Sequence, residues 1–63
     1  MKLFVSYWLV GISDAPEDTI ITLKETTLNL KTINEIKSKI VDESGENIDE
    51  SEVTIINIIK LDK

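Results

Sequence analysis

The stretch TINEIKSKIV, residues 32–41, decides the fold of this chain. Isoleucines recur in it at intervals of three and four positions, as Ile33, Ile36 and Ile40. Residues at this spacing lie on one face of an α-helix, and Val41 extends the same apolar stripe. The pattern therefore predicts one amphipathic helix, with a single face available for a core.

Both ends of this helix carry sequence signals. Thr32 is followed three positions later by Glu35, and a Thr-x-x-Glu pair is typical of a capping box at a helix N-terminus. At the other end Gly45 can adopt the left-handed conformation that terminates many helices. We expect the helix to begin at Thr32 and to fade by Ser44.

Three segments rich in β-branched and aromatic residues flank the helix, which is typical of strands. They are residues 2–12, 19–24 and 52–61. Residues 13–18 contain Pro16 between Ser and Asp residues and predict a turn, so the first two strands form an antiparallel hairpin. Residues 25–31 form a polar connection to the helix, with Leu28 and Leu30 expected as inward anchors.

The order of these elements, β-β-α-β, predicts an α+β fold. The helix returns the chain, so the third strand is antiparallel to the first if the two pair. The strand order 2-1-3 makes every pairing antiparallel and places the most apolar strand at the centre. The order 1-2-3 would require a parallel pair and leave that strand at an edge. We predict a three-stranded antiparallel sheet of order 2-1-3, with the helix packed on one face, in a single domain of residues 1–63.

Both faces of this sheet are predicted to be apolar, because successive strand side chains point to opposite sides. In the third strand, strict alternation places Ile58 opposite to Val53 and Ile59. One helix covers only one face, so we expect the other to be buried in a homodimer or on a partner. The alternative is that residues 13–18 and 25–31 fold over it. The predicted interface residues are Phe4, Trp8, Val10, Ile56 and Ile58.

Charge is distributed unevenly along the chain. Seven Lys and twelve acids give a net charge of −5, all of which arises from residues 42–63. Binding to nucleic acid or to an anionic membrane surface needs a cationic footprint, which this chain lacks. We expect an acidic loop that contacts a basic partner surface, and the alternative is a solvated connector. Its acids are Asp42, Glu43, Glu46, Asp49, Glu50 and Glu52.

The residues on which most enzyme chemistry depends are missing. The chain has no Cys and no His, which excludes disulfides, thiolate zinc sites and imidazole catalysis. An EF-hand loop counted from Asp42 would have Asn47 at its sixth position and Val53 at its twelfth, where calcium binding needs Gly and Glu. We therefore predict no enzyme, no catalytic residue, no metal and no cofactor. No apolar run approaches a membrane span and no signal peptide is visible, so we expect a cytoplasmic protein.

The opening MKLFVSY, residues 1–7, resembles the start of small uncharacterised phage and prophage proteins of Gram-positive bacteria, which often read M-K-x-F-V-S-Y. Those proteins continue with a strand, a helix with an I-x-x-I stripe and a closing strand with I-I-N. Ile33 and Ile36 fit that stripe, and residues 53–57 read VTIIN. The resemblance implies a small accessory phage product, and such products often bind and disable host proteins, including defence systems.

The leading functional hypothesis is a non-enzymatic, homodimeric protein-binding module that inhibits a host defence protein. Two alternatives stay open. One is a protein that sequesters a small signalling molecule between protomers, and the other is a structural or assembly component of the virion.

Overall fold

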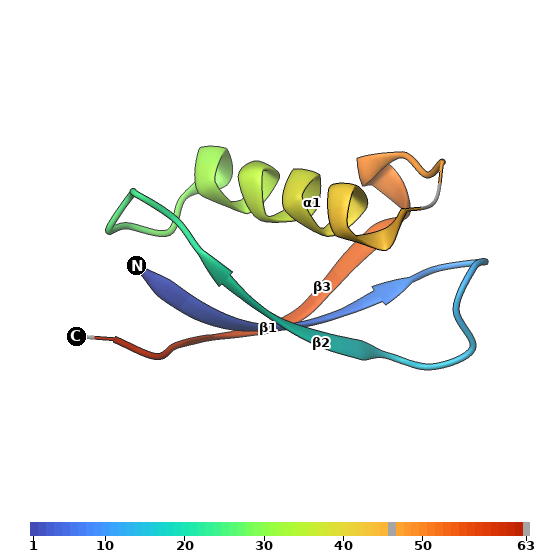
Figure 1. Cartoon of the computed structure of the whole chain (residues 1–63), viewed down its shortest axis with the longest axis horizontal. Helices are drawn as coiled ribbons and strands as arrows, with labels where there is room; N and C mark the ends of the chain where they lie inside the picture. Colours follow the sequence, from blue (N-terminus) through green and yellow to red (C-terminus); the bar gives the residue numbers. More distant parts are fainter. Residues whose placement is uncertain (46, 63) are drawn as a thin grey trace.

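The structure is a computed structural model that describes residues 1–45 and 47–62. Three strands form one antiparallel sheet of order β2-β1-β3, and one helix packs on a single face (Figure 1). The predicted α+β fold and strand order are confirmed. The elements are β1 (Lys2–Leu9), β2 (Glu17–Thr22), α1 (Leu30–Ser44), the 3₁₀ turn η1 (Glu50–Glu52) and β3 (Val53–Lys60).

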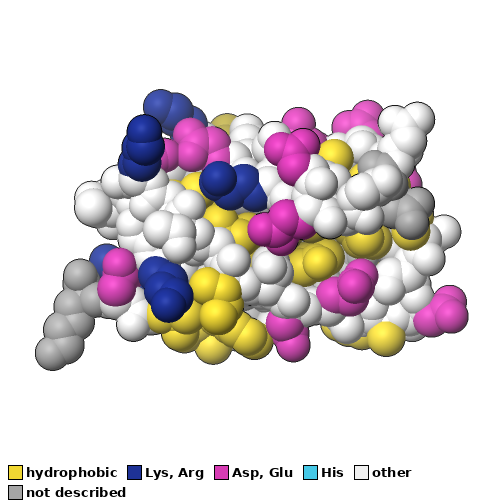
Figure 2. All heavy atoms as spheres, viewed as in Figure 1, with side chains coloured by type: hydrophobic (Ala, Val, Ile, Leu, Met, Phe, Trp, Pro, Cys, Tyr) yellow, Lys and Arg dark blue, Asp and Glu magenta, His cyan; other side chains and the backbone are white. Residues whose placement is uncertain are grey.

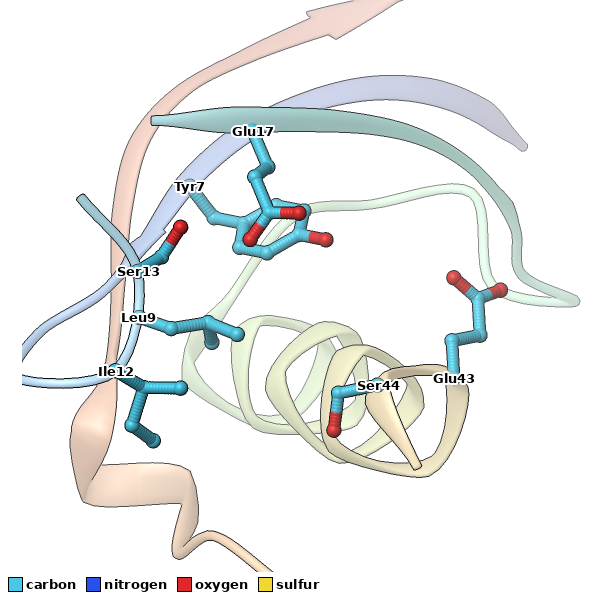
Figure 3. Close-up of a pocket in the computed structure, with 7 residues that line it drawn as sticks. All are labelled: Tyr7, Leu9, Ile12, Ser13, Glu17, Glu43 and Ser44. Atoms are coloured by element: carbon cyan, nitrogen blue, oxygen red, sulfur yellow. The ribbon is translucent and has the colours of Figure 1, made fainter. Parts of the chain in front are cut away.

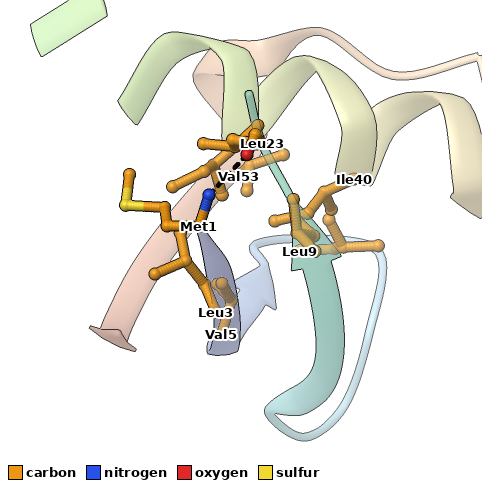
Figure 4. Close-up of a cluster of buried hydrophobic side chains, with 9 residues drawn as sticks. Met1, Leu3, Val5, Leu9, Leu23, Ile40 and Val53 are labelled. Atoms are coloured by element: carbon orange, nitrogen blue, oxygen red, sulfur yellow. Dashed lines mark hydrogen bonds between the residues drawn. The ribbon is translucent and has the colours of Figure 1, made fainter. Parts of the chain in front are cut away.

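The core lies between β1 and α1, in the layer that the helix covers (Figure 4). Leu3 and Val5 on β1 are fully buried, and Ile36 and Ile40 on α1 meet them from the helix side. Full burial of such a side chain contributes roughly 1.5–3 kcal/mol, so these few contacts account for most of the stability of a small domain. The remaining buried apolar residues are Met1, Leu9, Ile21, Leu23 and Val53.

The helix begins at Leu30, two residues earlier than predicted, and its N-cap lies three residues before Thr32. Asn29 is its N-cap, and the Asn29 Oδ1 accepts from the backbone N–H of Thr32 at 3.0 Å. In return the Thr32 Oγ1 accepts from the backbone N–H of Asn29 at 2.7 Å. Thr32 is therefore the N3 residue of a capping box with Asn29, and the predicted box between Thr32 and Glu35 is wrong. The C-terminal prediction is confirmed, because Gly45 ends the helix at a φ of 69°.

The two hairpin segments also end differently from the prediction. β1 stops at Leu9, because Gly11 has a φ of 82° and the N–H groups of Ile12 and Ser13 both donate to the Leu9 carbonyl. Glu17 already belongs to β2. The prediction that Leu28 and Leu30 point inward is wrong, because Leu30 is 77% exposed on the first turn of α1 and Leu28 is also exposed.

We expect Asn29→Ala to lower the free energy of unfolding by about 0.5–2 kcal/mol, because the N–H of Thr32 loses its cap. Asn34→Ala is the matched control, since Asn34 is exposed within the same helix and Ala favours helix. Urea denaturation of both variants measures the difference. Equal losses in the two variants would contradict the assigned cap.

Candidate functional site

No element of residues 1–45 and 47–62 covers the side of the sheet that faces away from α1, and we call this side the open face (Figure 1). Because Leu3, Val5 and Leu9 point into the core, the intervening β1 residues point to the open face. Figure 2 shows hydrophobic side chains gathered along this lower side of the sheet. The β1 residues on the open face are Lys2, Phe4, Ser6 and Trp8.

One apolar row crosses all three strands of the open face. Phe4 lies opposite Ile20 on β2 and opposite Ile59 on β3. Ile20 is 53% exposed and Ile59 is 48% exposed, while Phe4 between them is half-buried. We call these three residues the apolar row. Exposed apolar clusters of this kind mark contact surfaces.

A β-bulge in β3 corrects the predicted faces of this strand. The register shifts between Ser6 and Tyr7, so that Ser6 pairs with Asn57 and Tyr7 pairs with Ile55. Ile56 falls within the bulge and is exposed. The extra residue turns Ile58 onto the helix side, where it packs against the core. The prediction that Ile58 belongs to the uncovered face is therefore wrong, and Ile59 stands there instead.

The other predicted interface residues lie outside the core. Trp8 is 40% exposed at the end of the open face, and its indole N–H donates to the carbonyl of Ser13 at 2.9 Å. This bond ties the ring to the hairpin loop. Val10 follows β1, and its side chain is exposed. Its backbone N–H donates to the Glu52 carbonyl, which extends the hydrogen bonding between β1 and β3 by one residue. Sequence reasoning missed Ile20 and Ile59, because strand register is needed to find them.

Figure 2 shows the lysine side chains gathered toward one end of the long axis, whereas acidic side chains occur along its whole length. The start of β1, the ends of β2 and β3 and the start of α1 meet at one end, which we call the lysine end. The opposite end brings together the start of β2, the end of α1 and η1, and we call it the acidic end. The lysine end carries Lys2, Lys24, Lys31 and Lys60. The acidic end carries Glu17, Asp18, Asp42, Glu43, Asp49, Glu50 and Glu52.

The predicted acidic loop is mostly regular structure. Asp42 and Glu43 belong to the last turn of α1, and Asp49 caps η1 by accepting from the N–H of Ser51. Glu52 reaches back, and its Oε1 accepts from the N–H of Asp49 at 3.3 Å. Glu50 lies in η1, whereas Glu46 lies outside the described residues. The acids therefore wrap the end of the helix rather than extend as a loop.

A hollow of about 420 Å³ opens at the acidic end, between the end of α1 and the hairpin (Figure 3). The Tyr7 ring and the Glu17 and Glu43 side chains border it, with Leu9 and Ile12 on its apolar side. Glu43 Oε2 accepts from the Thr19 hydroxyl at 3.2 Å, which links α1 to β2 beside the hollow.

The surroundings of the Tyr7 phenol raise its pKa. Burial raises its pKa above the ordinary 10.0, and the carboxylates of Glu17, Glu43 and Asp18 raise it further. A negative potential near a phenol opposes its ionisation, because the phenolate would be a like charge. The acidic end is thus suited to a cationic group rather than to an anion.

Comparison with protein-family models, with curated proteins and with solved structures found no match. Within the described residues, no helix is long and apolar enough to cross a membrane. The same residues contain no group of three or more acids placed to hold a metal ion.

We expect Glu17→Gln to lower the pKa of Tyr7, because one of the like charges that oppose its ionisation is removed. The pKa should remain above the ordinary value, since burial is the larger cause. Tyr7 is the single Tyr of the chain, so its ultraviolet titration is read without overlap from another tyrosine. Glu50→Gln serves as the control and should leave the titration unchanged. An unchanged midpoint in Glu17→Gln would contradict the described position of this carboxylate.

Proposed function

We propose that this protein is a small, non-enzymatic, homodimeric protein-binding module. The observation that carries the proposal is the apolar row on a sheet face that no described residue covers. A chain of this size buries only about 60% of the surface that it exposes when unfolded, so burial of a further apolar face adds much to its stability. Self-association through the open face supplies that burial.

The acidic end supports binding to a second partner, one with a basic surface. The carboxylates at the end of α1 and in η1 lie on the helix side of the sheet, away from the apolar row, whereas Asp18 on β2 lies beside the row. A dimer formed through the open face therefore leaves this end accessible. Acidic side chains at the rim of an interface act mainly on the association rate and its salt dependence.

The resemblance of residues 1–7 to phage and prophage products supports a protein of the host cell as the partner. We propose a host protein, such as a defence protein, whose basic surface the acidic end occupies and blocks. This function places the protein in the cytoplasm of the host cell.

The test neutralises three exposed carboxylates of the acidic end, in the variant Asp42→Asn, Asp49→Asn and Glu50→Gln. Melting should change little, because Asn also caps helices and exposed substitutions shift stability by less than about 0.5 kcal/mol. Immobilised wild-type protein should capture a basic protein from a Gram-positive host lysate, identified by mass spectrometry. Association of that purified protein with the variant should be slower at low salt and less sensitive to added salt.

The matched control removes three carboxylates from the lysine end instead, in the variant Glu25→Gln, Glu35→Gln and Asp62→Asn. Its net charge equals that of the first variant, so a general charge effect would slow both. Slowing confined to the first variant supports the proposal. Equal association rates in wild type and both variants would contradict it and return the acidic end to a solubilising role.

A further inference from the structure

We propose that two copies pack open face to open face, with antiparallel strands and with the two-fold axis along the apolar row. This inference rests on the proposed self-association and specifies its register. A second copy of this chain fits the open face because both its apolar residues and its charges are self-complementary.

The apolar row makes the face self-complementary. It runs across the strands, because Ile20, Phe4 and Ile59 are direct cross-strand neighbours. A two-fold axis along this line brings each of the three residues over its own copy, as an isologous contact requires. The rotation also reverses strand direction between the copies. A residue two positions before Phe4 then lies over the residue two positions after it, so that Lys2 faces Ser6 of the other copy.

Charges flank the row with opposite sign. Lys2 lies on one side of it, and Asp18 lies on the other, opposite Ser6 on the neighbouring strand. The Ser6 hydroxyl donates to the Asp18 Oδ1 at 3.0 Å, which holds this carboxylate beside Ser6. Strands are spaced about 4.8 Å apart and packed sheets about 10 Å apart, so a Lys side chain spans the gap. Lys2 of each copy therefore contacts Asp18 of the other copy, so the dimer contains two such contacts.

Competing arrangements bring like charges together. An axis parallel to the strands through Phe4 would place Lys2 over its own copy. An axis across the strands through Ser6 would place Asp18 over its own copy. Like charges directly opposed across a contact are destabilising. Of these three axes, the one along the apolar row joins opposite charges while burying the row against itself.

The charge separation of the whole chain favours the same arrangement. In the proposed antiparallel pair, the acidic end of each copy lies beside the lysine end of the other. The lysine end also carries one acid, Asp62, whose carboxylate accepts from the backbone N–H of Lys2, which lowers the pKa of that carboxyl. The contact is small beside a standard interface of about 800 Å² per partner, so we expect a dissociation constant in the micromolar range or above.

A charge swap tests the register by sedimentation velocity from micromolar to millimolar protein. Wild type should show a concentration-dependent dimer. Lys2→Glu and Asp18→Lys should each raise the dissociation constant roughly tenfold, because two attractive contacts per dimer become repulsive. The double variant restores opposite charges and should return to within roughly threefold of wild type. Melting curves of the dilute variants establish that the monomers remain folded.

Cross-linking supplies an independent measurement, since the chain contains no Cys. Ile20→Cys places a thiol on the axis, where a short bismaleimide bridges facing sheets about 10 Å apart. Thr22→Cys is the control, because Thr22 is exposed two residues along the same strand and off the axis. The dimer should be linked efficiently through Ile20→Cys and poorly through Thr22→Cys.

Rescue by the double variant together with selective linking through Ile20→Cys supports the proposal. A dimer without rescue, linked equally by both thiols, overturns the register while leaving self-association in place. A monomer at every concentration overturns the second copy as occupant and assigns the open face to another protein. Because capture of a basic protein by the acidic end is measured separately, its failure is distinguishable from each of these results.

Discussion

A single helix over three strands is the constraint on which the rest of this structure depends. Ile36 and Ile40 on α1 bury Leu3 and Val5 on the central strand, and this contact forms the core. β1 also carries Phe4 and Trp8 on its other side, however, and α1 covers only the side of Leu3 and Val5. The described part of the chain has no further element for the second side, so its most apolar strand both builds the core and supplies the open face.

The bulge at Ile56 shapes both layers at once. Without it, strict alternation would keep Ile58 on the open face and Ile59 on the helix side. With it, Ile58 joins the core and Ile59 completes the apolar row opposite Phe4. A bulge also interrupts the regular hydrogen-bonding edge of β3, which disfavours pairing with another strand there. Association through the face is therefore favoured over extension of the sheet.

Much of the fold follows from local pattern, and the remainder depends on tertiary contacts. The isoleucine stripe and the antiparallel rule were sufficient to predict the helix, the strand order and the uncovered face. The bulge has no mark in the sequence, because neither Gly nor Pro occurs within β3. The Thr32–Glu35 spacing predicted a cap at Thr32, whereas Thr32 is buried in the first turn of α1 and Asn29 is the cap. The acids of residues 42–52 were visible in the sequence, whereas their mutual capping depends on the chain closing around the end of α1.

The proposed antiparallel register also affects how the acidic ends would bind a target. In the proposed dimer, reversal of the second copy would place the two acidic ends at opposite ends, with the carboxylates of α1 and η1 on the helix side, away from the contact. A target with two basic sites, or two neighbouring targets, could then be held at both ends. The second contact forms at an effective concentration set by the rigid distance between the ends, which strengthens overall binding without any new contact. In the proposed dimer, weak self-association and modest rim charges would combine into firm binding, because each copy would hold the other in the orientation that presents both ends.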